Sequence, residues 1–110
     1  MNINLNLHTS VLAEKALAYL PKKNDLNIID ATFGSGGYSK LILQKNNINN
    51  LIAIDRDPTV RKYSKSIQNK NNFILLEGQF SKIDLLVKDY MKEKKINGFD
   101  AIFFDLGISS

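Results

Sequence analysis

The fold is decided by the stretch Asn27-Ile28-Ile29-Asp30-Ala31-Thr32-Phe33-Gly34-Ser35-Gly36-Gly37-Tyr38. Its first half is a short apolar run that stops at a glycine cluster, which is typical of a buried strand over 27–32. The segment that follows, 38–45, turns Leu41 and Ile42 inward and predicts a helix. A strand, a glycine-rich turn and a helix in this order form the general binding site for nucleotide cofactors.

The same alternation of strand and helix extends over the rest of the chain. Further helices are expected over 9–20, from Pro58 to about residue 68, and from Ser81 through Met91, and further strands over 51–54, 73–76 and 99–106. Asp57 is interpreted as the cap of the helix that begins at Pro58. Ser81 and Asp84 resemble a capping box.

These strands are continuous apolar runs, which favours a parallel sheet covered on both faces. With right-handed crossovers, we predict a doubly wound α/β sheet of strand order 3-2-1-4.

Composition excludes several classes of protein. The chain has no cysteine and a single histidine, His8, so neither a disulfide framework nor a metal site is expected. No apolar run reaches about 18 residues, and the N-terminus lacks the basic region of a signal peptide, so we expect a soluble, cytoplasmic protein. The net charge of +4 suits a polyanionic partner. On charge alone, however, a solvated lysine surface is the preferred interpretation.

The glycine turn has the features of a cofactor site, but its spacing is unusual. Glycines at 34, 36 and 37 allow a sharp turn and close approach of a ligand. Ser39 stands where the dinucleotide-binding fingerprint has its third glycine. Asp30, four residues before Gly34, would repel a pyrophosphate, whereas it suits a ligand that carries an ammonium or sulfonium group.

Acidic and aromatic side chains follow the other strands. Asp55 ends the second strand, where a carboxylate accepts hydrogen bonds from both ribose hydroxyls of adenosine, in NAD and S-adenosylmethionine enzymes alike. Phe80 follows the third strand and either stacks on adenine or packs beneath the sheet, and Gln79 is a weaker candidate for the base edge. Asp105 ends the fourth strand, and we favour an active-site role over capping of a next helix.

Four segments together resemble the bacterial 16S ribosomal RNA cytosine-N4 methyltransferase family, in order and at matching intervals. They are His8-Thr9-Ser10-Val11-Leu12, the stretch from Asp30 to Gly37, Ala53-Ile54-Asp55-Arg56-Asp57-Pro58, and Phe104-Asp105-Leu106-Gly107-Ile108-Ser109-Ser110. The last segment is the most specific of the four.

The resemblance implies a class I, Rossmann-like methyltransferase fold, S-adenosylmethionine as cofactor, and a cytosine of 16S rRNA in the small ribosomal subunit as substrate. The cofactor-contact positions of the family fall on Gly36, Gly37, Tyr38, Asp55, Phe80 and Asp105, and the turn adds Gly34. The family commonly has a histidine where this chain has Tyr38, and a backbone contact at this position is compatible with that change.

Members of that family are far longer than this chain. We therefore expect residues 1–110 to be the N-terminal part of an S-adenosylmethionine-binding domain, truncated after about four strands, with cofactor contacts but no complete active site. A complementary C-terminal fragment would cover the open edge of the fourth strand. Two alternatives stay open: a non-catalytic remnant or interaction module, and an NAD-binding domain, which Asp30, the glycine spacing and Asp105 disfavour.

Overall fold

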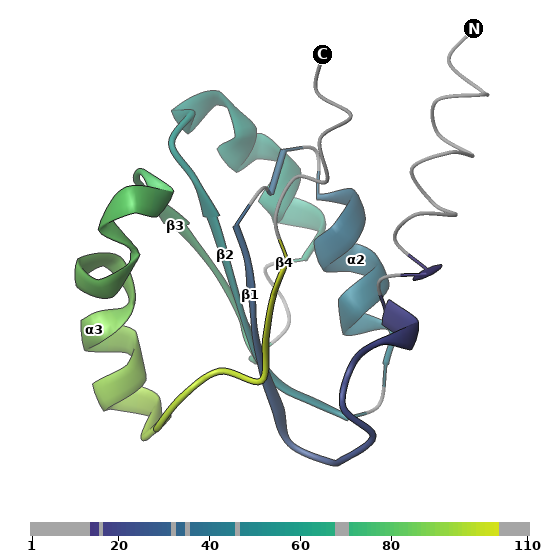
Figure 1. The fold of residues 1–110 in the computed structure, drawn as a ribbon. Helices are drawn as coiled ribbons and strands as arrows, with labels where there is room; N and C mark the ends of the chain where they lie inside the picture. The colour runs from purple at the N-terminus through teal and green to yellow at the C-terminus, as the bar shows by residue number, and fades with distance from the viewer. Residues whose placement is uncertain are drawn as a thin grey trace, which may run out of the picture.

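The computed structural model describes residues 14–103 except 16, 32, 35, 46 and 68–70. Four parallel strands form one sheet: β1 (Leu26–Asp30), β2 (Ile48–Asp55), β3 (Phe73–Glu77) and β4 (Ala101–Phe103). Their order is β3-β2-β1-β4, which confirms the predicted order (Figure 1). The strands pair in parallel, so that Asp30 lies level with Ala53 and Phe103, and Asp55 lies level with Glu77.

Helices cover both faces of the sheet, as the continuous apolar strands predict. The α-helix α2 (Gly37–Leu43) and the 3-10 helix η1 (Pro58–Ser66) lie on one face, and the α-helix α3 (Ile83–Lys94) lies on the other (Figure 1). The first face buries Leu17, Leu26, Ile28, Phe33, Ile42, Ile48, Leu51, Ala53, Ile67, Phe73 and Phe103. The second buries Ile29, Ala31, Ile52, Ile54, Val87, Tyr90 and Ile96.

The helix expected over 9–20 is only partly within the described residues. Glu14, Lys15, Leu17 and Ala18 are helical, and Leu17 is buried in the core of the first face. Within the described part of the chain, no helix is long and apolar enough to cross a membrane.

The helix predicted after Asp57 is present as a 3-10 helix that ends at Ser66, and Asp57 caps it as predicted by accepting from Thr59 N at 2.9 Å. One local prediction about the helices was wrong. Ser81 is not the cap of a capping box, because it lies inside the short 3-10 helix η2 (Phe80–Lys82) that leads into α3. An N-cap needs extended backbone, and a 3-10 turn does not supply it at Ser81.

A polar network joins the N-terminal ends of the strands, opposite the glycine turn. The Asn27 side-chain oxygen accepts from Asn50 Nδ2 at 2.9 Å, and Asn27 N donates to Asp100 at 2.8 Å. Asp100 also pairs with Lys23 at 2.7 Å. The Lys23 and Asn27 hydrogen bonds hold the pKa of Asp100 below its ordinary value. The abundant asparagines thus help to fix strand register.

Candidate functional site

The candidate site lies at the C-terminal edge of the sheet, where β1 and β2 end in Asp30 and Asp55. The chain leaves β1 into the glycine turn, and Phe33 N donates to Ile54 O at 3.3 Å, which holds the turn over the end of β2. Strand order reverses between β1 and β4, and ligands of open α/β sheets bind at such a point.

Asp55 joins three segments at this edge. One of its carboxylate oxygens accepts from Gly34 N at 2.9 Å, and the other accepts from Asp57 N at 3.0 Å. Its backbone carbonyl accepts from Gly78 N at 3.0 Å, directly after β3. The carboxylate is half-buried, and each oxygen can accept more than one hydrogen bond. Asp55 can therefore bind donor groups of a ligand while it holds the turn.

The three glycines of the turn differ in what they make possible. Gly36 has φ +88°, and a Cβ there would lie 3.1 Å from the buried ring of Phe33, so the fold itself requires glycine. A Cβ built on Gly34 or Gly37 would meet no atom of the described residues within 4 Å. The space beside these two glycines is open, as a site for a closely bound ligand needs to be.

Asp30 is fully buried, which the sequence did not indicate. Its carboxylate accepts from Ser39 Oγ at 2.7 Å, and Ser39 is itself fully buried on α2. This contact ties the end of β1 to the helix behind the turn. Ser39 is thus a supporting residue whose role the sequence analysis missed. The available signal was its position three residues before Ile42, on the inward side of α2.

The aromatic candidates lie in different surroundings. Phe80 begins η2 beyond the end of β3, is 37% exposed and belongs to neither buried core. The ring of Tyr38 lies 6.3 Å from that of Phe103 and packs against the core of the first face. The side chain of Tyr38 therefore has a structural contact of its own. Asp105, together with residues 104–110 and 1–13, lies outside the described residues.

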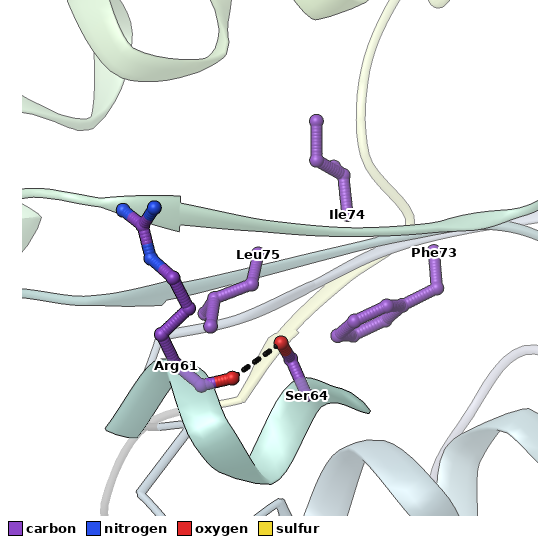
Figure 2. Close-up of a pocket in the computed structure, with 5 residues that line it drawn as sticks. All are labelled: Arg61, Ser64, Phe73, Ile74 and Leu75. Carbon is purple, nitrogen blue, oxygen red and sulfur yellow. Dashed lines mark hydrogen bonds between the residues drawn. The ribbon is translucent and has the colours of Figure 1, made fainter. Parts of the chain in front are cut away.

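Two of the surface hollows lined by described residues lie away from the glycine turn. One of about 260 Å³ lies between η1 and β3 (Figure 2), lined by Arg61, Ser64, Phe73, Ile74 and Leu75. There Ser64 Oγ donates to Arg61 O at 2.7 Å (Figure 2). Another, of about 470 Å³, lies at the opposite edge of the sheet beside Lys23 and Asp100. No group of three potential metal ligands occurs among the described residues.

Solved structures support the fold. A chain of the solved complex that contains the Haloferax volcanii Trm112 methyltransferase activator superposes with a TM-score of 0.52 at 21% identity, over 60% of this chain and 29% of that chain. Together with the sheet order, this likeness confirms the expected class I methyltransferase fold.

Sequence relatives identify the family. The ribosomal RNA small subunit methyltransferase H of Caldicellulosiruptor saccharolyticus is 41% identical over 105 residues, which cover 94% of this chain and 33% of that protein. The protein of the same name from Orientia tsutsugamushi is 40% identical over 107 residues, 96% of this chain and 32% of that protein. The chain thus spans about a third of the length of the curated relatives it matches. Residues 5–110 match the model of the MraW methylase family, whose members use S-adenosylmethionine as methyl donor, and this chain belongs to that family.

Proposed function

We propose that residues 1–110 form the cofactor-binding part of an enzyme that methylates N4 of a cytosine in 16S ribosomal RNA. The observation that carries the proposal is the contact between Asp55 and Gly34 N at 2.9 Å, which unites the strand-end acid and the glycine turn at one edge of the sheet. The substrate follows from the two relatives, both named as methyltransferases of small-subunit ribosomal RNA.

Each candidate residue has a role that its surroundings support. The Asp55 carboxylate accepts hydrogen bonds from the two ribose hydroxyls of S-adenosylmethionine, one on each oxygen. Each oxygen does so in addition to the backbone N–H that it already binds. The open space at Gly34 and Gly37 receives the cofactor. The exposed ring of Phe80 stacks on adenine. Gly36 and Tyr38 contribute backbone contacts, since Tyr38 packs its ring against the core.

The reaction requires groups that position and bind the target amine. The lone pair of a cytosine N4 amine is delocalised into the ring, so the amine is a poor nucleophile. The sulfonium of the bound cofactor supplies the electrophilic methyl group. The protein has to align the amine with that methyl and accept the amine's hydrogen bonds. Asp105 is the proposed acceptor, for the target amine or for the ammonium of the cofactor. The base must also be splayed out of its stack to reach the site.

Methyl transfer to isolated small-subunit RNA, followed by analysis of the modified nucleoside, tests this proposal. The chain alone is expected to bind S-adenosylmethionine without transferring methyl. A complementary segment, corresponding to the remaining two thirds of the relatives, is expected to restore transfer to N4 of cytosine. Full-rate transfer by the chain alone would contradict the assignment of a cofactor-binding part. A methyl group on another base atom would contradict the assigned product.

A folded chain that binds no cofactor would instead be the non-catalytic remnant that the sequence left open. NAD serves as the control ligand. At the position of the third fingerprint glycine, the buried Ser39 hydroxyl and Asp30 carboxylate fill the space between helix and strand. This packing does not favour a dinucleotide.

A further inference from the structure

The positive charge of the chain is concentrated in one segment. Residues 56–72 contain five basic residues, Arg56, Arg61, Lys62, Lys65 and Lys70, and one acidic residue, Asp57. In the rest of the chain the basic and acidic residues are equal in number, so the whole net charge of +4 lies in this segment. The basic residues are therefore not balanced by acidic ones in this stretch, as they are in the rest of the chain. Lys70 lies outside the described residues.

The helix η1 separates its apolar and its charged side chains. Val60, Ser64 and Ile67 face the sheet and are buried or half-buried, whereas Lys62 and Lys65 are exposed. Among the described residues, no carboxylate oxygen lies within 4 Å of the ammonium of either lysine. These two charges are therefore available to an external anion.

The neighbouring charges are arranged differently. The Arg61 guanidinium is paired with Glu77 at 2.7 Å. The Asp57 carboxylate accepts from the N–H and hydroxyl of Thr59, and the first of these bonds contributes most to holding the pKa of Asp57 below its ordinary value. The Asp57 carboxylate thus caps η1 and, among the described residues, forms no ion pair with either lysine.

An aromatic ring lies among these cations. Tyr63 is 41% exposed, and the ammonium of Lys62 lies 5.1 Å from the centre of its ring. Proteins that bind single-stranded nucleic acid combine cations along the backbone with aromatic rings on which bases stack. An exposed ring beside two lysines fits this partner better than it fits a simple inorganic anion.

The location of η1 fits the same partner. The helix begins three residues after Asp55, so its first turn adjoins the edge of the sheet that holds the candidate cofactor site, and Lys62 and Lys65 follow in its next two turns. On the opposite face of the sheet, α3 carries mixed charges, with Asp84, Asp89 and Glu93 beside Lys88, Lys92 and Lys94 (Figure 1). The two helices therefore differ in charge, since η1 carries three basic residues and no acidic one.

We propose that Lys62, Lys65 and the ring of Tyr63, here termed the η1 basic face, bind the RNA substrate, the lysines through its phosphates and the ring by stacking on a base. The choice of RNA among polyanions rests on the proposed function. Contacts of this kind position an RNA without reading its sequence. The face would hold the strand beside the cofactor site while residues elsewhere present the target base.

The salt dependence of RNA binding tests the η1 basic face. The chain is titrated into a labelled, unstructured RNA of about 20 nucleotides, over roughly 50 to 500 mM salt, and binding is followed by fluorescence anisotropy. Each phosphate contact on a single strand contributes about 0.7 to the slope of log K against log salt. The double variant Lys62→Gln/Lys65→Gln is therefore expected to lower the slope by about 1.4. Over a tenfold rise in salt, the unmodified chain should lose about 25-fold more affinity than the variant.

The matched control is Lys88→Gln/Lys92→Gln, which removes the same charge from exposed positions of α3. This control is expected to retain the slope of the unmodified chain. Equal effects of the two double variants, or no effect of the η1 variant, would overturn the proposal. Absence of RNA binding by the unmodified chain would overturn it as well. S-adenosylmethionine binding, measured on each protein, reports separately on the proposed function and on correct folding of the variants.

Discussion

Substitution of Gly36 by alanine should destabilise the fold by an amount that follows from its geometry. Gly36 has φ +88° and ψ 10°, in the left-handed region. A residue with a Cβ is less stable in this conformation by about 1–2 kcal/mol. The new Cβ would also lie 3.1 Å from the ring of Phe33, which is 2% exposed and has little room to move. Overpacking of a buried site adds about 1 kcal/mol. We therefore expect Gly36→Ala to lower the free energy of unfolding by about 2–3 kcal/mol.

Urea denaturation without ligand measures this effect. For a chain of this size, where unfolding free energy falls by about 1.5 kcal/mol per molar urea, the midpoint should fall by roughly 1 to 2 M. Gly37→Ala is the matched control, because Gly37 has ordinary φ and open space, and begins α2, where alanine is a better helix former. Equal midpoints for the two variants would refute the argument from backbone geometry and close contact.

Three further predictions concern ligand binding and acid stability. Phe80→Ala should weaken S-adenosylmethionine binding in calorimetric titration with little change in urea midpoint, since the ring belongs to neither buried core. Tyr63→Ala should weaken RNA binding roughly fivefold or more while the salt slope stays unchanged, because stacking involves no charge. Asp100 has a lowered pKa in the folded state, so its stabilisation is present above pH about 4 and is lost as pH falls through the folded value. Asp100→Asn should therefore lower the urea midpoint at pH 7, and progressively less below pH about 4.

The sheet could be predicted from the sequence because its determinants are local. Continuous apolar runs such as the one before Asp55 indicate strands buried on both faces, and the crossover rule then leaves few possible orders. The type of η1 could not be predicted, because its inward residues Val60 and Ser64 and the following Ile67 fit α-helical spacing. The capping-box prediction at Ser81 was wrong because a 3-10 turn precedes the helix α3, and residue spacing alone does not reveal such a turn.

The candidate site was predictable in position but not in its internal contacts. Placing Gly34 and Asp55 at strand ends follows from the topology of a parallel sheet. Their hydrogen bond depends on the turn curling over β2, which no local pattern specifies. Asp30 could not be recognised as buried, because its partner Ser39 lies beyond the turn. Most aspartates are exposed unless a partner of this kind is present.

The central claim is that the glycine turn and Asp55 bind S-adenosylmethionine, and calorimetric titration of the purified chain tests it most directly. The chain is titrated with S-adenosylmethionine and, as control, with NAD. Saturable, single-site binding of S-adenosylmethionine and no binding of NAD are expected. Binding of NAD, or failure of the folded chain to bind S-adenosylmethionine, would contradict the central claim.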